Sequence, residues 1–295
     1  MSSGRPVIVT DSTSTLSAER AAERGIVVVP LQVVIGNEVY DEGVGGATPE
    51  TVAEALREFR PVSTSRPGPE RLREVYEAAG RDGATAVVSI HLSAEMSGTF
   101  ESAQLAAAQA SVPVLPVDTR QVGVATGFAA LAAADVLDAG GSAEEAAEAA
   151  RRRAAASTSL FYVDTLEYLR RGGRVGTAAA LIGGALAVKP LLEIRDGRVA
   201  TREKVRTTTR ALARLEELAA EAAGEGPVDL CVAHLAAADR AAQLTDRLRT
   251  RLGDQLEGRE PVCAEVGAVL GAHVGPGMLA VCVAPRLDGG ESPSR

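Results

Sequence analysis

The sequence has few cysteines, no long hydrophobic run and no obvious stripe of basic residues. Three cysteines without paired spacing argue against a disulfide framework or a zinc site. No stretch reaches the ~20 apolar residues of a membrane span, and the N-terminal residues lack the apolar core of a signal peptide. The net charge of −8 offers no concentrated positive charge to a phosphate backbone. We therefore expect a cytoplasmic chain without an integral membrane segment or a nucleic-acid partner.

Sequence motifs of nucleotide and metal enzymes are also missing. There is no Gly-x-x-x-x-Gly-Lys-Ser/Thr loop, no Gly-x-Gly-x-x-Gly after a strand and no Cys-x-x-Cys pair. Cys231, Cys263 and Cys282 each lie in a short apolar run, which predicts buried strand positions where the thiol packs as a small hydrophobic group. These absences weaken the case for an enzyme that uses a nucleotide or a metal.

Short apolar strands alternate with helical segments along the chain, which predicts an α/β fold. The length of 295 residues favours two domains. We place an N-terminal α/β domain with a mostly parallel sheet at residues 1–157. A second α/β domain at 158–288 is expected to have a mixed sheet, because Asp196 and Gly197 predict a hairpin turn. Residues 289–295 are predicted to form a disordered tail. Residues 26–35 are predicted as one long strand, and residues 63–67 as a loop between two helices.

Two hydroxyl-rich segments of the first domain are candidate anion sites. Thr64 lies among three hydroxyls just before a proline, where hydroxyls and amides can bind an anion, although a plain helix cap explains the same residues. Ser93 and Ser97 follow a buried strand and precede a helix. Free N–H groups at a helix N-terminus favour a carboxylate or phosphate, and Gly98 would let it approach the backbone. An ordinary serine cap is the alternative for this segment.

Two residues of the second domain are further candidates, and one histidine suggests a different function. Arg206 ends a strand before a helix and could either reach an anionic head group or face solvent. His273 lies in a small-residue helix, where a packed core histidine is the simpler interpretation. His91, two residues before Ser93, allows the hypothesis of a serine hydrolase that uses Ser93 or Ser97 with a histidine. The Gly-x-Ser-x-Gly elbow of many such hydrolases is absent.

Taken in order, these segments resemble the DegV family of fatty-acid-binding proteins. The match includes Thr-Asp-Ser at 10–12, Thr-Ser-x-Pro at 64–67, Ser-Gly-Thr at 97–99, Gly-Gly-Arg at 172–174, Lys-Val-Arg-Thr at 204–207 and Gly-Ala-His at 271–273. Each motif is short, but their common order over nearly the whole chain is specific. Three positions depart from the family pattern, one of them Thr119, which follows Asp118 where Ser is usual. Arg66 replaces a usual Gln, and Ala94 replaces a common second Ser, which makes the choice between Ser93 and Ser97 harder.

The resemblance implies a carrier that buries one long-chain fatty acid in an apolar tunnel, uses no other cofactor and performs no chemistry of its own. Its carboxylate would be held by Thr64 and Ser97, with Ser93 as the neighbouring candidate. In the fatty-acid kinase branch, Arg206 and His273 are implied as well, and a separate ATP-using fatty acid kinase subunit forms the acyl phosphate. The apolar segment at 178–188 could line the tunnel. A regulator that binds another small carboxylate is a third hypothesis beside carrier and hydrolase.

Overall fold

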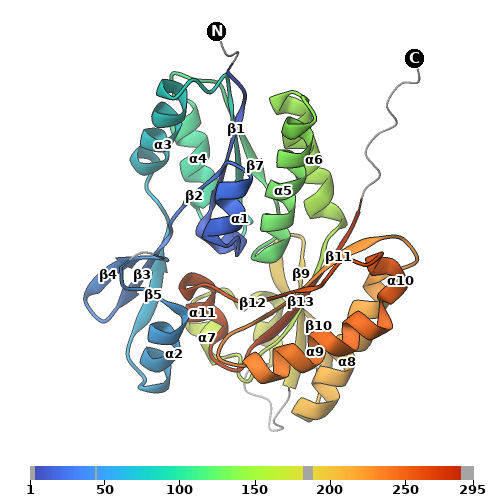
Figure 1. The fold of residues 1–295 in the computed structure, drawn as a ribbon. Helices are drawn as coiled ribbons and strands as arrows, with labels where there is room; N and C mark the ends of the chain where they lie inside the picture. Colours follow the sequence, from blue (N-terminus) through green and yellow to red (C-terminus); the bar gives the residue numbers. More distant parts are fainter. Residues whose placement is uncertain (1–3, 44, 182–188, 287–295) are drawn as a thin grey trace.

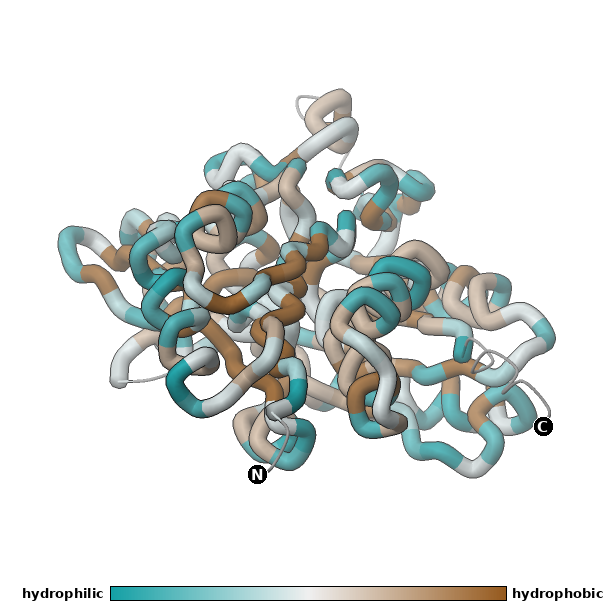
Figure 2. Tube along the Cα trace, turned by 90° about the horizontal axis from the view of Figure 1, so that it is seen from above, coloured by the Kyte–Doolittle hydropathy of each residue, from teal (hydrophilic) through white to brown (hydrophobic). Residues whose placement is uncertain are grey.

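The computed structural model describes residues 4–43, 45–181 and 189–286. Within these ranges the strands form three sheets, and helices cover them in layers (Figure 1). The most hydrophobic stretches of chain run through the middle of the molecule, while hydrophilic stretches lie toward its periphery (Figure 2). The fold is α/β, with a parallel sheet in the first half and a mixed sheet in the second, as the sequence predicted.

The first sheet is entirely parallel and has the strand order β2-β1-β6-β7. Alternate residues of β1 face opposite sides: Ile8 packs toward α5 and α6, and Val9 toward α3 and α4. Helices therefore cover both faces, as a parallel sheet requires (Figure 1). The elements are β1 (Val7–Asp11), η1 (Ser12–Ser14), α1 (Ala18–Glu23), β2 (Ile26–Val29), α3 (Pro69–Arg81), β6 (Val87–His91), α4 (Thr99–Ala107), β7 (Val114–Asp118), α5 (Val124–Asp138) and α6 (Ala143–Ala156).

A small antiparallel sheet in the order β4-β3-β5 lies beside α2. Its elements are β3 (Gln32–Ile35), β4 (Glu38–Asp41), α2 (Pro49–Arg57) and β5 (Val62–Ser65). The prediction of one strand over residues 26–35 was wrong, because Pro30 has no N–H to donate and ends β2. The next amide, of Leu31, donates to the Ser12 hydroxyl at 3.0 Å, and the chain continues into β3 of the second sheet.

Residues 63–65 were predicted as a loop, but the structure places them in β5, paired with β3. Val33 of β3 lies opposite Thr64, and Val34 lies opposite Ser63. This pairing joins residues about thirty positions apart, which a local pattern does not reveal. The consequence for the site is that Thr64 has a fixed direction, because successive side chains of a strand point to opposite faces.

The third sheet has six strands in the order β10-β9-β8-β13-β11-β12, and β11 with β12 is its one parallel pair among the described residues. The predicted turn at Asp196 and Gly197 joins β9 to β10. The elements are β8 (Thr158–Tyr162), α7 (Glu167–Arg171), η2 (Gly176–Leu181), β9 (Lys189–Arg195), β10 (Arg198–Val205), α8 (Thr208–Ala223), β11 (Val228–His234), α9 (Ala238–Arg251), α10 (Gly253–Leu256), β12 (Val262–Glu265), α11 (Ala268–Val274) and β13 (Leu279–Pro285).

Further predictions have different outcomes. Cys231 and Cys282 are buried as expected, but Cys263 is exposed, because β12 is an edge strand of its sheet. Of the segment 178–188, residues up to Leu181 belong to a 3-10 helix in which Ala178 is buried, and residues 182–188 lie outside the described ranges. The tail at 289–295 lies outside them too. The division at Ser157 stays a prediction: it falls between α6 and β8, but α5 and α6 also pack against β13.

The described helices include none that is both long and apolar enough to span a bilayer. In the same part of the chain, no group of three or more His, Cys, Asp or Glu side chains is arranged to hold a metal ion.

Candidate functional site: an apolar pocket with a polar cluster

A pocket lies where the three sheets meet, and residues from both halves of the chain form its wall. Its empty volume is about 990 Å³, including solvent space where it opens. Small-molecule sites are mostly apolar with a few placed polar groups, and the wall of this pocket has that composition. Apolar lining residues come from many separate segments of the chain, among them those that carry Leu31, Leu92, Phe161, Ile194, Val199 and Leu270.

Four of the polar side chains in the wall, those of Thr64, Ser97, Arg174 and His273, form a cluster linked by short contacts. Thr64 on β5 and His273 on α11 meet through a hydrogen bond of 2.9 Å between Oγ1 and Nε2. His273 lies against Gly172, whose carbonyl accepts a hydrogen bond from Arg174 at 2.6 Å. Arg174 also donates its Nε to the carbonyl of Met96 at 3.0 Å, next to Ser97. The polar lining residues are Thr15, Thr64, Ser97, Ser159, Arg174 and His273.

His273 is a neutral imidazole with one nitrogen unpaired. Burial, together with the positive charge of Arg174, lowers the pKa of His273 to about 4. Its Nδ1 is buried and has no hydrogen-bond partner among the described residues. The ring fits only because residue 172 is glycine: a Cβ there would lie 2.1 Å from Nδ1. Because a neutral imidazole has one N–H and one lone pair, the Thr64 contact depends on which nitrogen holds the proton.

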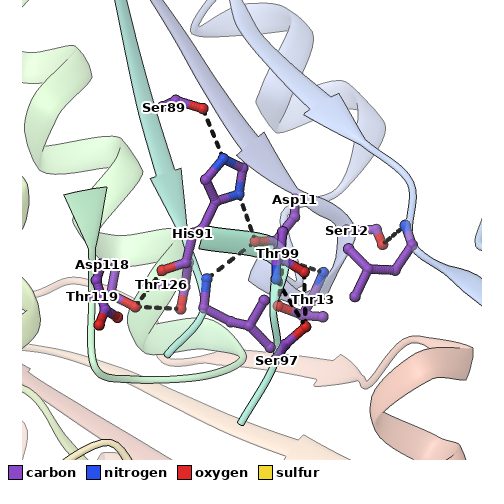
Figure 3. A network of polar contacts seen from close by, with 12 residues as sticks. Asp11, Ser12, Thr13, Ser89, His91, Ser97, Thr99, Asp118, Thr119 and Thr126 are labelled. Atoms are coloured by element: carbon purple, nitrogen blue, oxygen red, sulfur yellow. Dashed lines mark hydrogen bonds and ion pairs between the residues drawn. The ribbon is translucent and has the colours of Figure 1, made fainter. Parts of the chain in front are cut away.

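Ser97 lies in the turn between β6 and α4 and lines the pocket. Its hydroxyl oxygen is 2.8 Å from that of Thr99 and accepts the Thr99 amide at 3.3 Å, so Figure 3 shows the pair together. Gly98, the N-cap of α4, supplies no side chain to cap the helix. The free N–H groups and the positive dipole end of α4 therefore lie beside Ser97, which favours a negative charge there.

The arginine near the cluster is Arg174, which the sequence predictions missed. Arg206 follows β10 as predicted, but it is exposed and is not a lining residue of the pocket. The signal for Arg174 was present in the Gly-Gly-Arg motif at 172–174. Arg66, which departs from the family pattern, donates to the carbonyl of Gly98 at 2.9 Å and pairs with Glu101 at 2.8 Å, so it is engaged at the start of α4.

Ser93 is fully buried but does not line the pocket. Its hydroxyl donates to the carbonyl of Gly197 at 2.8 Å, in the hairpin turn of the second half. His91, the partner considered for a hydrolase, contacts Ser89 and Asp11 instead. In the part of the chain that the structure describes, neither Ser93 nor Ser97 has a hydrogen bond to a histidine, so the nucleophile–base pair of a serine hydrolase is not formed.

Glu42 fixes the helix that carries His273. It follows β4, is 7% exposed, and accepts the Val269 amide at 2.8 Å near the start of α11. Burial raises the pKa of its carboxyl group, while the nearby Ser12 hydroxyl and the hydrogen bond from the Val269 amide lower it in part. The small sheet thus contacts α11 near both ends, through Glu42 at the start and Thr64 near the finish.

Comparison with known proteins gives one consistent result. The sequence pattern of the family described as "Uncharacterised protein, DegV family" matches residues 6–286. A DegV domain-containing protein of Streptomyces coelicolor is 53% identical over 279 residues, which cover 95% of this chain and 98% of that protein. Protein DegV of Bacillus subtilis is 34% identical over 278 residues, covering 93% and 97%.

Solved structures of similar proteins share the fold. A DegV family protein of Thermus thermophilus, described with fatty acid binding, superposes with a TM-score of 0.86 at 31% identity, over 96% of this chain and 100% of that one. DegV of Bacillus subtilis, described as a fatty acid binding protein, has a TM-score of 0.87 at 33% identity, over 95% and 99%.

Proposed function

The chain belongs to the DegV family, and from that premise we propose that it binds one long-chain fatty acid in the pocket, with the carboxylate at the polar cluster. The observation that carries the proposal is that one pocket wall combines an apolar lining with a cluster of polar side chains. Apolar side chains from many segments surround the cavity, and Thr64, Ser97, Arg174 and His273 all line it, with contacts of His273 and Arg174 linking them.

The energetics require a pocket that exists before the ligand arrives. A saturated chain of about 16 carbons buries roughly 14 methylenes at about 0.8 kcal/mol each, so roughly 11 kcal/mol as an upper figure. Immobilising a ligand costs an estimated 4–15 kcal/mol, which offsets most of that gain. Strands β8, β9, β10 and β13 and helix α11 hold the wall in place, and this preorganisation supports the proposal.

The head group is bound by hydrogen bonds whose direction the geometry sets. A carboxylate accepts hydrogen bonds only, so Thr64 must direct its O–H at the ligand. Its oxygen must then accept from His273, which requires the proton on Nε2 and leaves Nδ1 as the unprotonated nitrogen. This tautomer also leaves no N–H buried without an acceptor at Nδ1. Ser97 and the start of α4 donate from another side, and Arg174 supplies positive charge.

Extraction of the purified protein tests this function directly. Denaturing the protein and analysing the organic extract by mass spectrometry should release close to one long-chain fatty acid per chain. Protein stripped of lipid should bind long-chain acids and should not bind acids of four to six carbons, which would separate a carrier from a regulator of small carboxylates. A folded protein that neither carries nor accepts long-chain acids would refute the proposal.

A finer proposal, which rests on the family resemblance, is that the chain presents the carboxylate to an ATP-using kinase subunit and performs no catalysis itself. The loaded protein with ATP alone should form no acyl phosphate, and addition of a fatty acid kinase subunit should produce it. Acyl phosphate formed by this chain alone would contradict the non-catalytic role. A fluorophosphonate probe should label neither Ser93 nor Ser97, because neither contacts a histidine.

A further inference from the structure

The loop that carries Ser97 is held by the opposite half of the chain. This Ser93 loop, residues 92–98, links β6 to α4. Ser93 donates to the carbonyl of Gly197, and Glu95 forms an ion pair with Arg198. From another side, Arg174 donates to the carbonyl of Met96. The loop belongs to the parallel sheet, but its position depends on elements of the six-stranded sheet.

Ser93 approaches Gly197 closely because the turn has the right backbone conformation and residue 197 has no side chain. Asp196 and Gly197 both have positive φ, +53° and +79°, which is the conformation of the tight turns that join twisted hairpins. A Cβ at Gly197 would lie 2.5 Å from the Ser93 hydroxyl oxygen, so glycine is required by the approach as well as by the turn. Arg120 reinforces the same place by donating to the carbonyl of Asp196 at 3.0 Å.

The hairpin and the Ser93 loop are neighbouring parts of the pocket wall. Ile194 and Val199 pair across the hairpin just before and after its turn, and both line the pocket. Met96 and Ser97 line it from the loop. Elsewhere the wall consists of strands joined by backbone ladders, for example β8 with β9 and β13. Where the hairpin meets the Ser93 loop, a boundary called the seam below, side-chain contacts join them instead of a backbone ladder. The ion pair between Glu95 and Arg198 is largely exposed, so it contributes little to the stability of this contact.

We propose that Ser93 is a latch residue that positions the hairpin against the Ser93 loop, and that fatty-acid exchange requires its hydrogen bond to Gly197 to break. The proposal rests on the proposed function and replaces the earlier assignment of Ser93 as a head-group ligand. Opening at the seam separates Ile194 and Val199 from Met96 and exposes the apolar interior. The same movement displaces Ser97, so release of the chain and release of the carboxylate are coupled.

Exchange kinetics distinguish a latch from a ligand. We would measure association and dissociation of cis-parinaric acid, a fluorescent polyene fatty acid, by stopped flow, with oleate as displacing acid. Ser93→Ala should raise both rate constants about fivefold and leave Kd within about twofold, because the lost hydrogen bond stabilises the closed wall in the free and the loaded protein alike. Ser97→Ala should instead raise Kd through the dissociation rate alone. Ser63→Ala, an exposed serine beside Thr64, is the matched control.

Each alternative outcome is decisive. If Ser93→Ala raises Kd through dissociation only, as for Ser97→Ala, then Ser93 binds the head group and the latch is wrong. Unchanged rates with normal affinity also overturn the latch while leaving the proposed function intact, whereas a wild-type protein that binds no fatty acid overturns both. Arg198→Ala keeps the test available if Ser93→Ala unfolds: Arg198 is exposed, and its loss should speed exchange about twofold in both directions.

Discussion

Two histidines in this protein each contact a hydroxyl group, but their surroundings are opposite. His91 lies between Ser89 at 2.7 Å and Asp11 at 2.9 Å, and all three side chains are fully buried (Figure 3). His273 contacts Thr64 at 2.9 Å, lines a pocket, and has a second nitrogen without a partner among the described residues. The first site has its hydrogen bonds satisfied internally, and the second has polar groups left over.

The buried network has the composition of a hydrolase triad without its accessibility. The order of atoms, serine hydroxyl to Nε2 and Nδ1 to carboxylate, is that of Ser-His-Asp enzymes. The Ser89 hydroxyl, however, is also 2.7 Å from the hydroxyl of Tyr76, and burial raises the pKa of Tyr76 to about 12. A chain of hydrogen bonds from Tyr76 through Ser89 and His91 to Asp11 uses every group, so His91 belongs to an internal structural network. His273 keeps the free polar groups that the proposed ligand-binding role needs.

The largest effect should follow from breaking the satisfied network at Asp11. Its carboxylate accepts from the Thr13 amide and hydroxyl, the Leu92 amide and His91. Asp11→Asn puts an N–H₂ group against buried donors, so we expect the free energy of unfolding to fall by roughly 3–5 kcal/mol. Urea unfolding followed by circular dichroism measures this change.

Asp118→Asn is the matched control for Asp11, because Asp118 ends another strand of the same sheet. Its two amide partners, Ala94 and Arg120, both donate to one oxygen, so an asparagine carbonyl can accept them both. We expect a cost below about 1 kcal/mol for this variant. Equal costs for the two variants would show that the buried network has no special structural weight.

The second effect concerns the pH dependence that His273 gives to stability. The pKa of His273 is about 4 in the folded protein against about 6.5 in the unfolded chain. Between these values the unfolded chain binds more protons, so the free energy of unfolding falls as the pH is lowered from about 6.5 to about 4, by at most about 3 kcal/mol. His273→Gln should remove this part of the slope in urea titrations, whereas Thr64→Val should keep it. Parallel slopes for wild type and His273→Gln would contradict the assignment.

The third effect separates binding from stability at the polar cluster. Thr64→Val and Ser97→Ala each remove a donor to a charged carboxylate, worth about 1.5–3 kcal/mol. Kd for a long-chain fatty acid should rise roughly 10- to 150-fold in isothermal titration. Because neither hydroxyl belongs to the buried network of Asp11, the unfolding midpoint should fall much less in either variant than in Asp11→Asn. Wild-type affinity in both variants would refute the head-group assignment.

Local patterns in the sequence predicted most helices and strands, but they did not predict which distant segments pair. Alternating apolar strands and helices predicted the α/β class, and Asp196 with Gly197 predicted the β9–β10 hairpin. The break at Pro30 had a local signal, yet the partner that takes over after it, β5, lies far along the chain. The pairing that makes Thr64 a strand residue is tertiary, so a one-dimensional pattern could not supply it.

The site shows the same division. Short motifs predicted Thr64, Ser97 and His273, and these three line one pocket. The motifs also contained two candidate serines, Ser93 and Ser97, and two arginines, Arg174 and Arg206. Ser97 and Arg174 line the pocket, whereas the Ser93 side chain points to Gly197 and Arg206 is exposed. These directions depend on turn geometry and on packing between halves, which spacing alone does not encode.

The smallest effect comes from a group between the two extremes, Glu42. It is buried like Asp11, but only one of its oxygens is engaged, by the Val269 amide, and the other has no hydrogen-bond partner in the described ranges. Burial raises its pKa above the unfolded value, so the stability that this carboxyl group contributes is fully present below the unfolded pKa and is lost as the pH rises through the folded pKa. Glu42→Gln keeps a carbonyl acceptor for Val269 and removes the buried charge. The variant should therefore gain roughly 0.5–1 kcal/mol over wild type at pH 8, the size of one net hydrogen bond, and nothing near pH 4.

Urea unfolding of Glu42→Gln at several pH values measures this difference, and Glu42→Ala provides the contrast. The alanine variant loses the acceptor for Val269 and should be destabilised at every pH, with weaker fatty-acid binding, because α11 positions His273. If glutamine destabilises the protein at pH 8 as much as alanine does, the charge itself is required. Glu42 would then resemble Asp11, as a carboxylate whose hydrogen bonds compensate for its burial. The number of hydrogen-bond partners of a buried group would then not distinguish the structural network around His91 from the polar cluster around His273.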